Sequence, residues 1–149
     1  MGANRRGRLN QDNLGYLLAR ASRRWNELLY RQFVLGGFPQ VRPAYGALLV
    51  PLFEQDGLQM GDLAQKAGIS KQTMTTMIRQ LETEKLVKKM RDPEDGRACR
   101  VYLTATARKF EPVAERALAH MEKTVGSLAP SETRQQLEQV LRRMISISL

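Results

Sequence analysis

Apolar residues recur at helical spacing along most of this chain, and the pattern is clearest between Ser70 and Glu84. Four apolar residues in this stretch stand at i, i+3, i+4 and i+7, which places them on one side of a helix. They are Met74, Met77, Ile78 and Leu81. Ser70 is a suitable N-cap, and Gly68 can end a preceding helix in a left-handed turn. The pattern predicts an amphipathic helix that begins just after a tight turn.

The other sides of this helix carry an unusual set of polar residues. Exposed helices are ordinarily covered with Glu and Lys, whereas this one carries hydroxyls, an amide and a guanidinium. The residues are Gln72, Thr73, Thr75, Thr76 and Arg79. Such groups suit hydrogen bonds to base edges and to phosphates. We therefore expect Ser70–Glu84 to be a recognition helix that lies in a DNA major groove.

Three helices are predicted before it. The first begins with Asp12 as its cap and ends at Gly36-Gly37, and its apolar stripe is long enough to pair with a helix of another chain. The second starts at Pro43 and should be kinked or shortened by Pro51. The third, at about residues 61–67, lacks a good cap and would form a helix–turn–helix with the recognition helix.

After the recognition helix the period changes. Residues 86–90 and 99–103 read as two short strands, joined by a charged turn at 91–97, so they predict a hairpin "wing". Two further helices follow, capped by Thr104 and Ser131, and Pro112 should bend or restart the first of them. Their predicted inward residues are Phe110, Val113, Ala114, Ala117, Leu118, Met121 and Val125, then Leu137, Val140, Leu141, Met144 and Ile145.

These elements predict a mainly α fold with a small β-hairpin wing. We expect a flexible basic arm at residues 1–10, a dimerisation helix at 11–37, a winged helix-turn-helix DNA-binding domain at 38–103, and linking and dimerisation helices at 104–149. At 149 residues the chain can bury a reasonable core, although long helical extensions would need a partner to cover their apolar faces.

The net charge of the chain limits the classes of molecule that it is expected to bind. The formal net charge is +9, and the excess lies at the N-terminus and around the predicted recognition helix. A basic surface fits a polyanion, with nucleic acid first and an anionic membrane second. One cysteine and one histidine cannot build a disulfide framework or a zinc site within one chain. No apolar run approaches the ~20 residues that span a bilayer, and we expect a cytoplasmic protein without a cofactor.

Roles can be assigned to the candidate DNA-binding residues. We expect Ser70, Lys71 and Thr73 to contact phosphates, and Gln72, Thr75, Thr76 and Arg79 to read bases. In the wing, Arg97 would enter the minor groove, where the negative potential is deep, and Lys88 and Arg91 would contact the DNA backbone. Asp92 and Asp95 would orient Arg97 or the loop backbone, since a carboxylate near phosphate is repelled. A merely solvated wing face remains the alternative for the lysines.

Three segments of the chain carry a family resemblance. They are the stretch from Leu63 through Gly68-Ile69-Ser70 to Leu81, the turn Arg91-Asp92-Pro93-Glu94-Asp95-Gly96-Arg97, and Val101-Tyr102-Leu103-Thr104. Together they resemble the MarR family of bacterial winged-helix transcription regulators. The matching core covers about 45 residues, and the Asp-Pro-x-Asp-x-Arg turn is its most specific part. The resemblance implies a homodimer on a pseudo-palindromic operator, a repressor, and release of DNA when a small phenolic or anionic ligand binds between the dimer arm and the winged domain.

The resemblance has limits. Pro112 is unusual for the family, and the single cysteine, Cys99, lies in the wing rather than near the first helix, where peroxide-sensing members carry theirs. Candidate ligand contacts are Arg20, Trp25, Tyr45 and His120, on the helices that would wall the cleft. Trp25 could instead pack in the dimer core, and His120 could be a half-exposed helix residue.

Other functions stay open. The basic charge also permits a non-specific nucleoid or RNA-binding protein, and the arginines of the first helix permit a membrane-surface role. For an enzyme we find no Ser-His-Asp spacing, no carboxylate pair in an evident cleft, no Gly-rich phosphate loop and no metal cluster, so we predict no catalytic residues.

Overall fold

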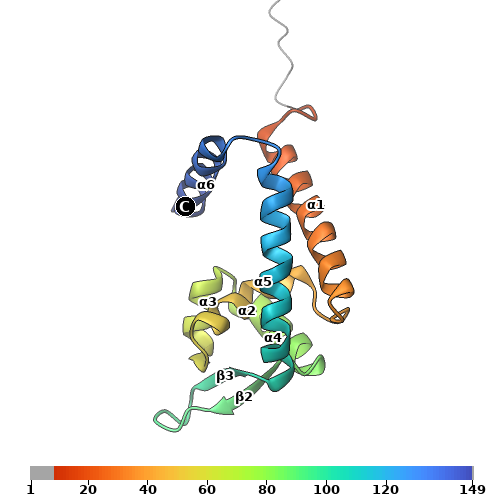
Figure 1. Ribbon diagram of the computed structural model, residues 1–149. Helices are drawn as coiled ribbons and strands as arrows, with labels where there is room; N and C mark the ends of the chain where they lie inside the picture. Colours follow the sequence, from red (N-terminus) through yellow and green to blue (C-terminus); the bar gives the residue numbers. More distant parts are fainter. Residues whose placement is uncertain (1–8, 149) are drawn as a thin grey trace, which may run out of the picture.

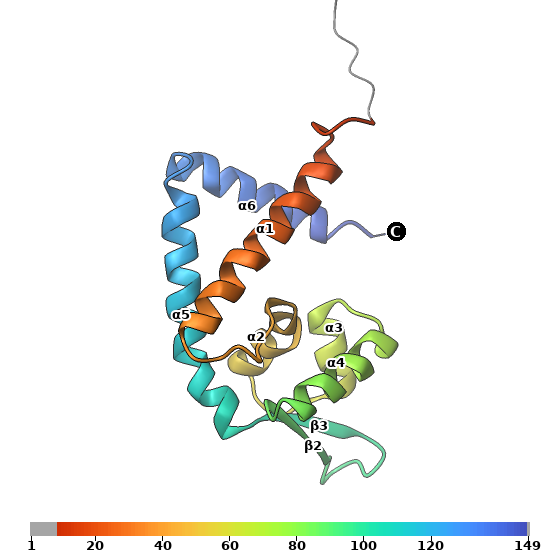
Figure 2. The ribbon, with the colours of Figure 1, turned by 90° about the vertical axis from the view of Figure 1, so that its right-hand side faces the viewer.

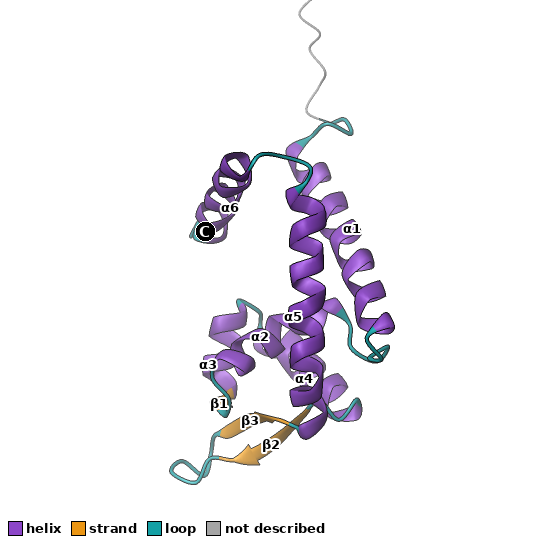
Figure 3. Ribbon diagram, viewed as in Figure 1, coloured by secondary structure: helices purple, strands orange, loops and turns teal. Residues whose placement is uncertain are grey.

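A computed structural model describes residues 9–148 of the chain. The elements run in the order α1 (Leu14–Leu35), η1 (Pro43–Tyr45), α2 (Gly46–Glu54), β1 (Leu58–Gln59), α3 (Met60–Ala67), α4 (Lys71–Thr83), β2 (Val87–Arg91), β3 (Cys99–Leu103), α5 (Ala105–Gly126) and α6 (Ser131–Ile145) (Figures 1 and 3). The predicted class, mainly α with a small wing, is confirmed. The predicted basic arm lies outside the described residues, apart from Leu9 and Asn10.

The long helices α1 and α5 pack together at their lower ends, diverge above, and rise from a compact lower unit that holds α2, α3, α4 and the strands (Figures 1 and 2). The N-cap of α1 is Asn13, whose side chain accepts a hydrogen bond from the Tyr16 N–H, so the predicted Asp12 cap was one residue early. The helix ends at Gly36, and an added Cβ there would meet Val113 Cγ1 of α5 at 2.4 Å. A glycine at this position therefore lets the two helices approach closely.

One apolar core runs through the lower unit and into the α1–α5 pair. Its fully buried side chains come from α2, α3, α4, β3 and the loop residues Val41 and Leu86, and the base of α5 closes over them. The largest are Leu48, Leu49, Leu52, Leu63, Met74, Ile78, Leu81, Leu86, Val41 and Val101. Helix α2 continues through Pro51 and ends three residues later, at Glu54. Of α4, only the side that carries Met74, Ile78 and Leu81 is buried in this core.

The wing contains one strand that the sequence pattern did not predict. β1 pairs with β3, and β3 pairs with β2, so the sheet is antiparallel with the order β1-β3-β2. Two residues are too few to show alternation, which is why β1 escaped detection. Gly57 precedes it at φ +72, and a Cβ there would meet the Tyr102 ring at 2.7 Å. β1 ties the root of the hairpin to the helical core.

Thr104 caps α5, and its Oγ1 accepts a hydrogen bond from the Ala107 N–H at 3.2 Å, as predicted. The helix runs through Pro112 without a restart. Two side chains predicted to point inward, Leu118 and Val125, are 38% and 36% exposed. Both therefore lie at the edge of the buried side of α5, which Ala117 and Met121 occupy at 4% and 2% exposed.

Helix α6 stands apart from the rest of the chain (Figures 1 and 2). Its N-cap residue is Pro130, without a side-chain hydrogen bond, so the predicted Ser131 cap was wrong. The five side chains predicted to be inward are not buried within this chain, and Val140, Met144 and Ile145 are 59%, 52% and 83% exposed. None of the described helices is long and apolar enough to cross a membrane.

Candidate nucleic-acid interface

Helix α4 presents its polar residues to solvent and its apolar residues to the core. Met74, Ile78 and Leu81 are at most 1% exposed, and Met77 is half-buried. The predicted contact residues on the other sides are all exposed: Ser70, Lys71, Gln72, Thr73, Thr75, Thr76 and Arg79. They lie on α4 and at its N-cap, and α4 stands at the lower end of the molecule, beside the wing (Figure 2). The fold therefore brings these residues together on one accessible surface.

The start of α4 is set by its cap and by the preceding turn. Gly68 adopts the left-handed conformation at φ +64, as predicted, and closes α3 with hydrogen bonds to the Ala64 and Gln65 carbonyls. Ser70 Oγ then accepts the Thr73 N–H at 3.1 Å. Capping stabilises the start of α4 at this turn, because it satisfies an N–H that the helix cannot pair internally.

Two threonines on the exposed side have their hydroxyl protons engaged. Thr75 Oγ1 donates to the Lys71 carbonyl at 2.9 Å, and Thr76 Oγ1 donates to the Gln72 carbonyl at 3.2 Å. Each side chain then offers solvent an acceptor oxygen and a methyl group. Those groups can accept from the amino group of adenine or cytosine and can contact the thymine methyl.

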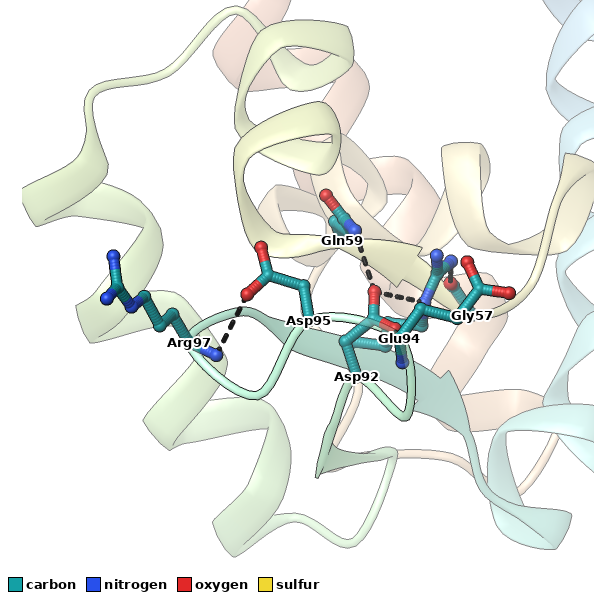
Figure 4. A network of polar contacts seen from close by, with 7 residues as sticks. Gly57, Gln59, Asp92, Glu94, Asp95 and Arg97 are labelled. Carbon is teal, nitrogen blue, oxygen red and sulfur yellow. Dashed lines mark hydrogen bonds and ion pairs between the residues drawn. The ribbon is translucent and has the colours of Figure 1, made fainter.

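The wing carries a second group of exposed basic residues. Lys88, Arg91 and Arg97 are all exposed, on β2 and on the turn that follows it. The Arg97 N–H donates to Asp95 Oδ1 at 3.1 Å, which shapes the turn through the backbone. Figure 4 shows the Arg97 side chain extending away from the polar network beneath the wing. Its guanidinium is therefore open to an external partner.

Asp92 lies under the wing and is 3% exposed. Its carboxylate accepts hydrogen bonds from the Glu94 N–H at 2.9 Å, from Gln59 Nε2 at 2.7 Å and from Arg100 Nε at 2.8 Å. The backbone bond from Glu94 acts most strongly, followed by Gln59 and Arg100. Together they hold the pKa of Asp92 below its ordinary value, although burial acts in the opposite direction.

Sequence reasoning missed the partners of this aspartate. Arg100 also donates from Nη1 to the Gly57 carbonyl at 2.8 Å, so it joins the wing to the segment before β1 (Figure 4). At the wing's base, Asp56 accepts from the Leu103 N–H at 2.9 Å and pairs with Arg108 at 2.8 Å. Only the sheet pairing brings these residues together. In the sequence, the short strand pattern at residues 99–103 was the single local signal near Arg100, and it did not indicate that Arg100 would pair with Asp92.

A shallow hollow at the C-terminal half of α4 adds another basic residue to this surface. It is lined by Arg42, Tyr45, Arg79, Gln80, Thr83 and Glu84. Arg42 is exposed just before η1, and the hollow places it near the predicted contact Arg79. The sequence offered no reason to single out Arg42, because its neighbour on α4 is far away along the chain.

A second cavity, of about 350 Å³, opens where α1, α2 and α5 meet, and Arg42 lines both it and the hollow. None of the four candidate ligand residues lines it. Arg20 is exposed and lies over the Tyr16 ring, and His120 is exposed on α5. Trp25 packs against the core, and Tyr45 is 6% exposed within it. Within residues 9–148, no group of three or more His, Cys, Asp and Glu side chains could hold a metal ion.

Part of this arrangement is similar to a known protein family. The MarR family model matches residues 44–99, which run from η1 to the first residue of β3. Over these residues the chain is similar to the MarR family. MarR-family proteins are transcriptional regulators. The match covers α4 and the whole wing turn, where the candidate contacts lie.

A curated protein similar to this chain is the "Uncharacterized HTH-type transcriptional regulator YdgJ" of Bacillus subtilis (strain 168), 31% identical over 97 residues. That match covers 65% of this chain and 59% of the relative, so it spans less than two thirds of the relative's length. The structure of the transcriptional repressor CouR bound to a 23-mer DNA duplex is similar, with a TM-score of 0.77 and 25% identity, over 93% of this chain and 99% of CouR. The PcaV transcriptional regulator from Streptomyces coelicolor, in complex with its natural ligand, has the same fold, with a TM-score of 0.78 and 20% identity over 97% of each chain.

Proposed function

We propose that this chain is a sequence-specific double-stranded DNA-binding regulator that acts as a homodimer on a pseudo-palindromic operator. In this proposal it represses transcription and releases DNA when a small ligand binds. The observation that carries the proposal is the division of α4: its apolar side is buried, and the hydroxyl, amide and guanidinium groups on its other sides are exposed. A helix that packed its polar face inside the protein could not read DNA.

Each protomer would make two kinds of contact. The exposed face of α4 would enter the major groove, with Gln72, Thr76 and Arg79 toward the bases. Arg97 at the wing tip would reach the neighbouring minor groove, where negative potential attracts guanidinium groups. Arg42 would add a phosphate contact at the far end of α4, as its place beside Arg79 supports.

The helices outside the winged unit support the dimer. α6 has no buried residue, and its apolar residues recur at 137, 140, 141, 144 and 145, which is one side of a helix. At the other end, Leu14 and Leu17 of α1 are 69% and 48% exposed. Single exposed leucines are ordinary, but a helix whose whole apolar side faces water indicates a missing partner. A second copy of the chain would cover it and set two recognition helices ~34 Å apart, one DNA turn.

The cavity between α1, α2 and α5 supports ligand control. It is walled both by the winged unit, through α2, and by the long helices that would carry the dimer. A ligand there would alter the angle between the two parts, and a few kcal/mol of preference for the altered angle is enough to release DNA. PcaV, which has this fold, is known in complex with its natural ligand.

The first experiment compares DNA fragments. Fluorescence anisotropy would measure affinity for the promoter fragment upstream of this gene and for random DNA of equal length, at several salt concentrations. The proposal expects the promoter to bind at least about a thousandfold more tightly at moderate salt. Equal affinity for both DNAs would favour the nucleoid alternative, and preferential binding to anionic vesicles in a pelleting assay would favour a membrane-surface role.

Two variants test the role of α4 itself. Gln72→Ala and Arg79→Ala should change which base is preferred at single operator positions, because a good base contact discriminates by about 1–3 kcal/mol. Gln139→Ala, an exposed residue of α6, is the matched control and should leave sequence preference unchanged. A uniform loss of affinity for all DNA would reassign the altered residue to a phosphate contact.

A further inference from the structure

The cavity between α1, α2 and α5 has an apolar interior. Leu29 and Phe33 of α1, Leu49 of α2 and Phe110 of α5 are buried in its wall, and the rings of Phe33 and Phe110 meet edge to face at 4.8 Å. Phe53 adds a third aromatic ring. A volume of about 350 Å³ lies within the range of small-molecule sites. The interior would therefore accept an aromatic or aliphatic group of modest size.

The charged lining residues are mostly acidic. Glu54 comes from the end of α2, and Glu111 and Glu115 come from α5, while Arg42 is the one lining residue with a positive charge. No ion pair joins these four residues to one another or to any other residue of the described chain. The lining therefore carries a net negative charge, although the whole chain carries +9.

The two glutamates of α5 also indicate that the cavity favours a positively charged ligand. Glu111 and Glu115 are four residues apart, so they lie on the same side of the helix, and like charges at this spacing weaken a helix slightly. Glu111 is half-buried, which costs a carboxylate part of its hydration. A cation in the cavity mouth would relieve both costs.

We infer that this cavity binds a lipophilic organic cation, with its apolar group among Phe33, Phe53 and Phe110 and its charged head beside Glu54, Glu111 and Glu115. The phenylalanine faces add to the selection, because aromatic rings attract ammonium groups. This ligand class is opposite in charge to the anionic class that the family resemblance implies. The inference rests on the proposed function in taking the cavity as the effector site, but binding itself can be tested without DNA.

Charge outside the lining counts for less than the lining itself. The excess positive charge of the chain lies at the N-terminus and around α4 and the wing, and Arg42 lines both this cavity and the hollow beside α4. Exposed charges farther than about 8 Å are largely screened at physiological salt, whereas a bound head group would sit against the carboxylates at the mouth. The local charges therefore decide which sign of ligand the cavity accepts.

Three probes of nearly equal shape separate charge from size. Benzyltrimethylammonium carries a positive head, neopentylbenzene is its neutral carbon analogue, and phenylmethanesulfonate carries a negative head. Titration calorimetry on the full-length protein without DNA would measure the three affinities. The cation should bind at least about tenfold more tightly than either of the others, and this margin should shrink as salt is raised.

Variants assign the preference to the glutamates. In Glu54→Gln/Glu111→Gln/Glu115→Gln the cation should lose its tenfold advantage, while binding of the neutral probe stays within twofold. Glu122→Gln, an exposed α5 residue that does not line the cavity, changes net charge in the same direction and should leave the preference intact. Circular dichroism would confirm that each variant is folded.

The outcomes are distinct. Tighter binding of the anion, an unchanged cation preference in the triple variant, or no binding of any probe would each overturn the inference. If the cation binds as expected but the protein does not distinguish promoter from random DNA, the binding site stands and the proposed function fails. If promoter recognition holds and the cation does not bind, only the ligand class fails.

Discussion

The exposed side of α6 gives the sharpest test of the dimer. Val140 and Met144 stand four residues apart on this side and are 59% and 52% exposed. We predict that Val140→Glu/Met144→Glu abolishes dimerisation at micromolar concentration without unfolding the protomer. The protomer should survive because no residue of α6 belongs to the buried core.

The size of the effect follows from the exposed area. Complete burial of an aliphatic side chain of this size contributes about 1.5–3 kcal/mol, and each of these two still has about half of its surface to bury, or about 1 kcal/mol. Two residues on each of two protomers contribute about 4 kcal/mol, which corresponds to about a thousandfold in the dimer dissociation constant. Four added carboxylates in the interface would weaken it further, because they would be buried without partners.

Sedimentation velocity over a range of concentrations would measure the dimer constant, and circular dichroism would follow the fold. The matched control is Gln135→Glu/Gln139→Glu, which adds the same charges at the same spacing on the opposite, exposed side of α6 and should remain dimeric. Binding to an operator half-site should survive in the Val140/Met144 variant, and the gain from a full site should be lost. A variant with the native dissociation constant, or a native protein that sediments as a monomer, would refute the reasoning.

Three further predictions concern α4 and the wing. Arg97→Ala should weaken DNA binding and reduce the slope of log affinity against log salt by about one per protomer, whereas Arg134→Ala on α6 should not; an unchanged slope would count against the wing contact. Asp92→Asn should destabilise the fold at neutral pH. Because the folded state lowers the pKa of Asp92, its contribution is present above the ordinary value of 3.8 and is lost as pH falls below it, so urea unfolding of the variant should vary less in acid than that of the native chain. Lys85 follows α4 in the left-handed backbone conformation, at φ +57, which glycine adopts without strain. Lys85→Gly should therefore stabilise the protein by about 0.5–1 kcal/mol and raise Tm by a few degrees. An equal gain from Lys85→Ala would show that the left-handed backbone is not the cause.

Local patterns predicted most of the elements. The spacing of Met74, Ile78 and Leu81 was enough to place α4 and to choose its buried side, because helical periodicity depends on neighbours three and four residues away. Ser70, Gly68 and Thr104 were found for the same reason, since a cap bonds within its own turn. The caps at Asn13 and Pro130 were misjudged by one residue: Asp12 and Asn13 offered equivalent polar starts, and α6 begins after Pro130 without a side-chain cap.

Features made by distant residues could not be predicted in this way. β1 exists because Leu58 pairs with Val101, and the support of Asp92 by Gln59 spans 33 positions along the chain. Nothing in the local pattern of either residue specifies its partner. The cavity is likewise made where three helices meet, and none of the residues chosen from sequence as ligand contacts lines it.

The amino-acid sequence by itself determined the helix that faces outward with hydroxyls, amide and guanidinium, the charged hairpin beside it, and an apolar side on the last helix. These are properties of residues a few positions apart, and the backbone period alone decides which of them share a face. The tertiary structure decided which of those faces are covered. It buries the apolar side of α4, leaves that of α6 exposed, and gathers three glutamates from two helices around one cavity, because burial and local charge depend on which elements pack together in space.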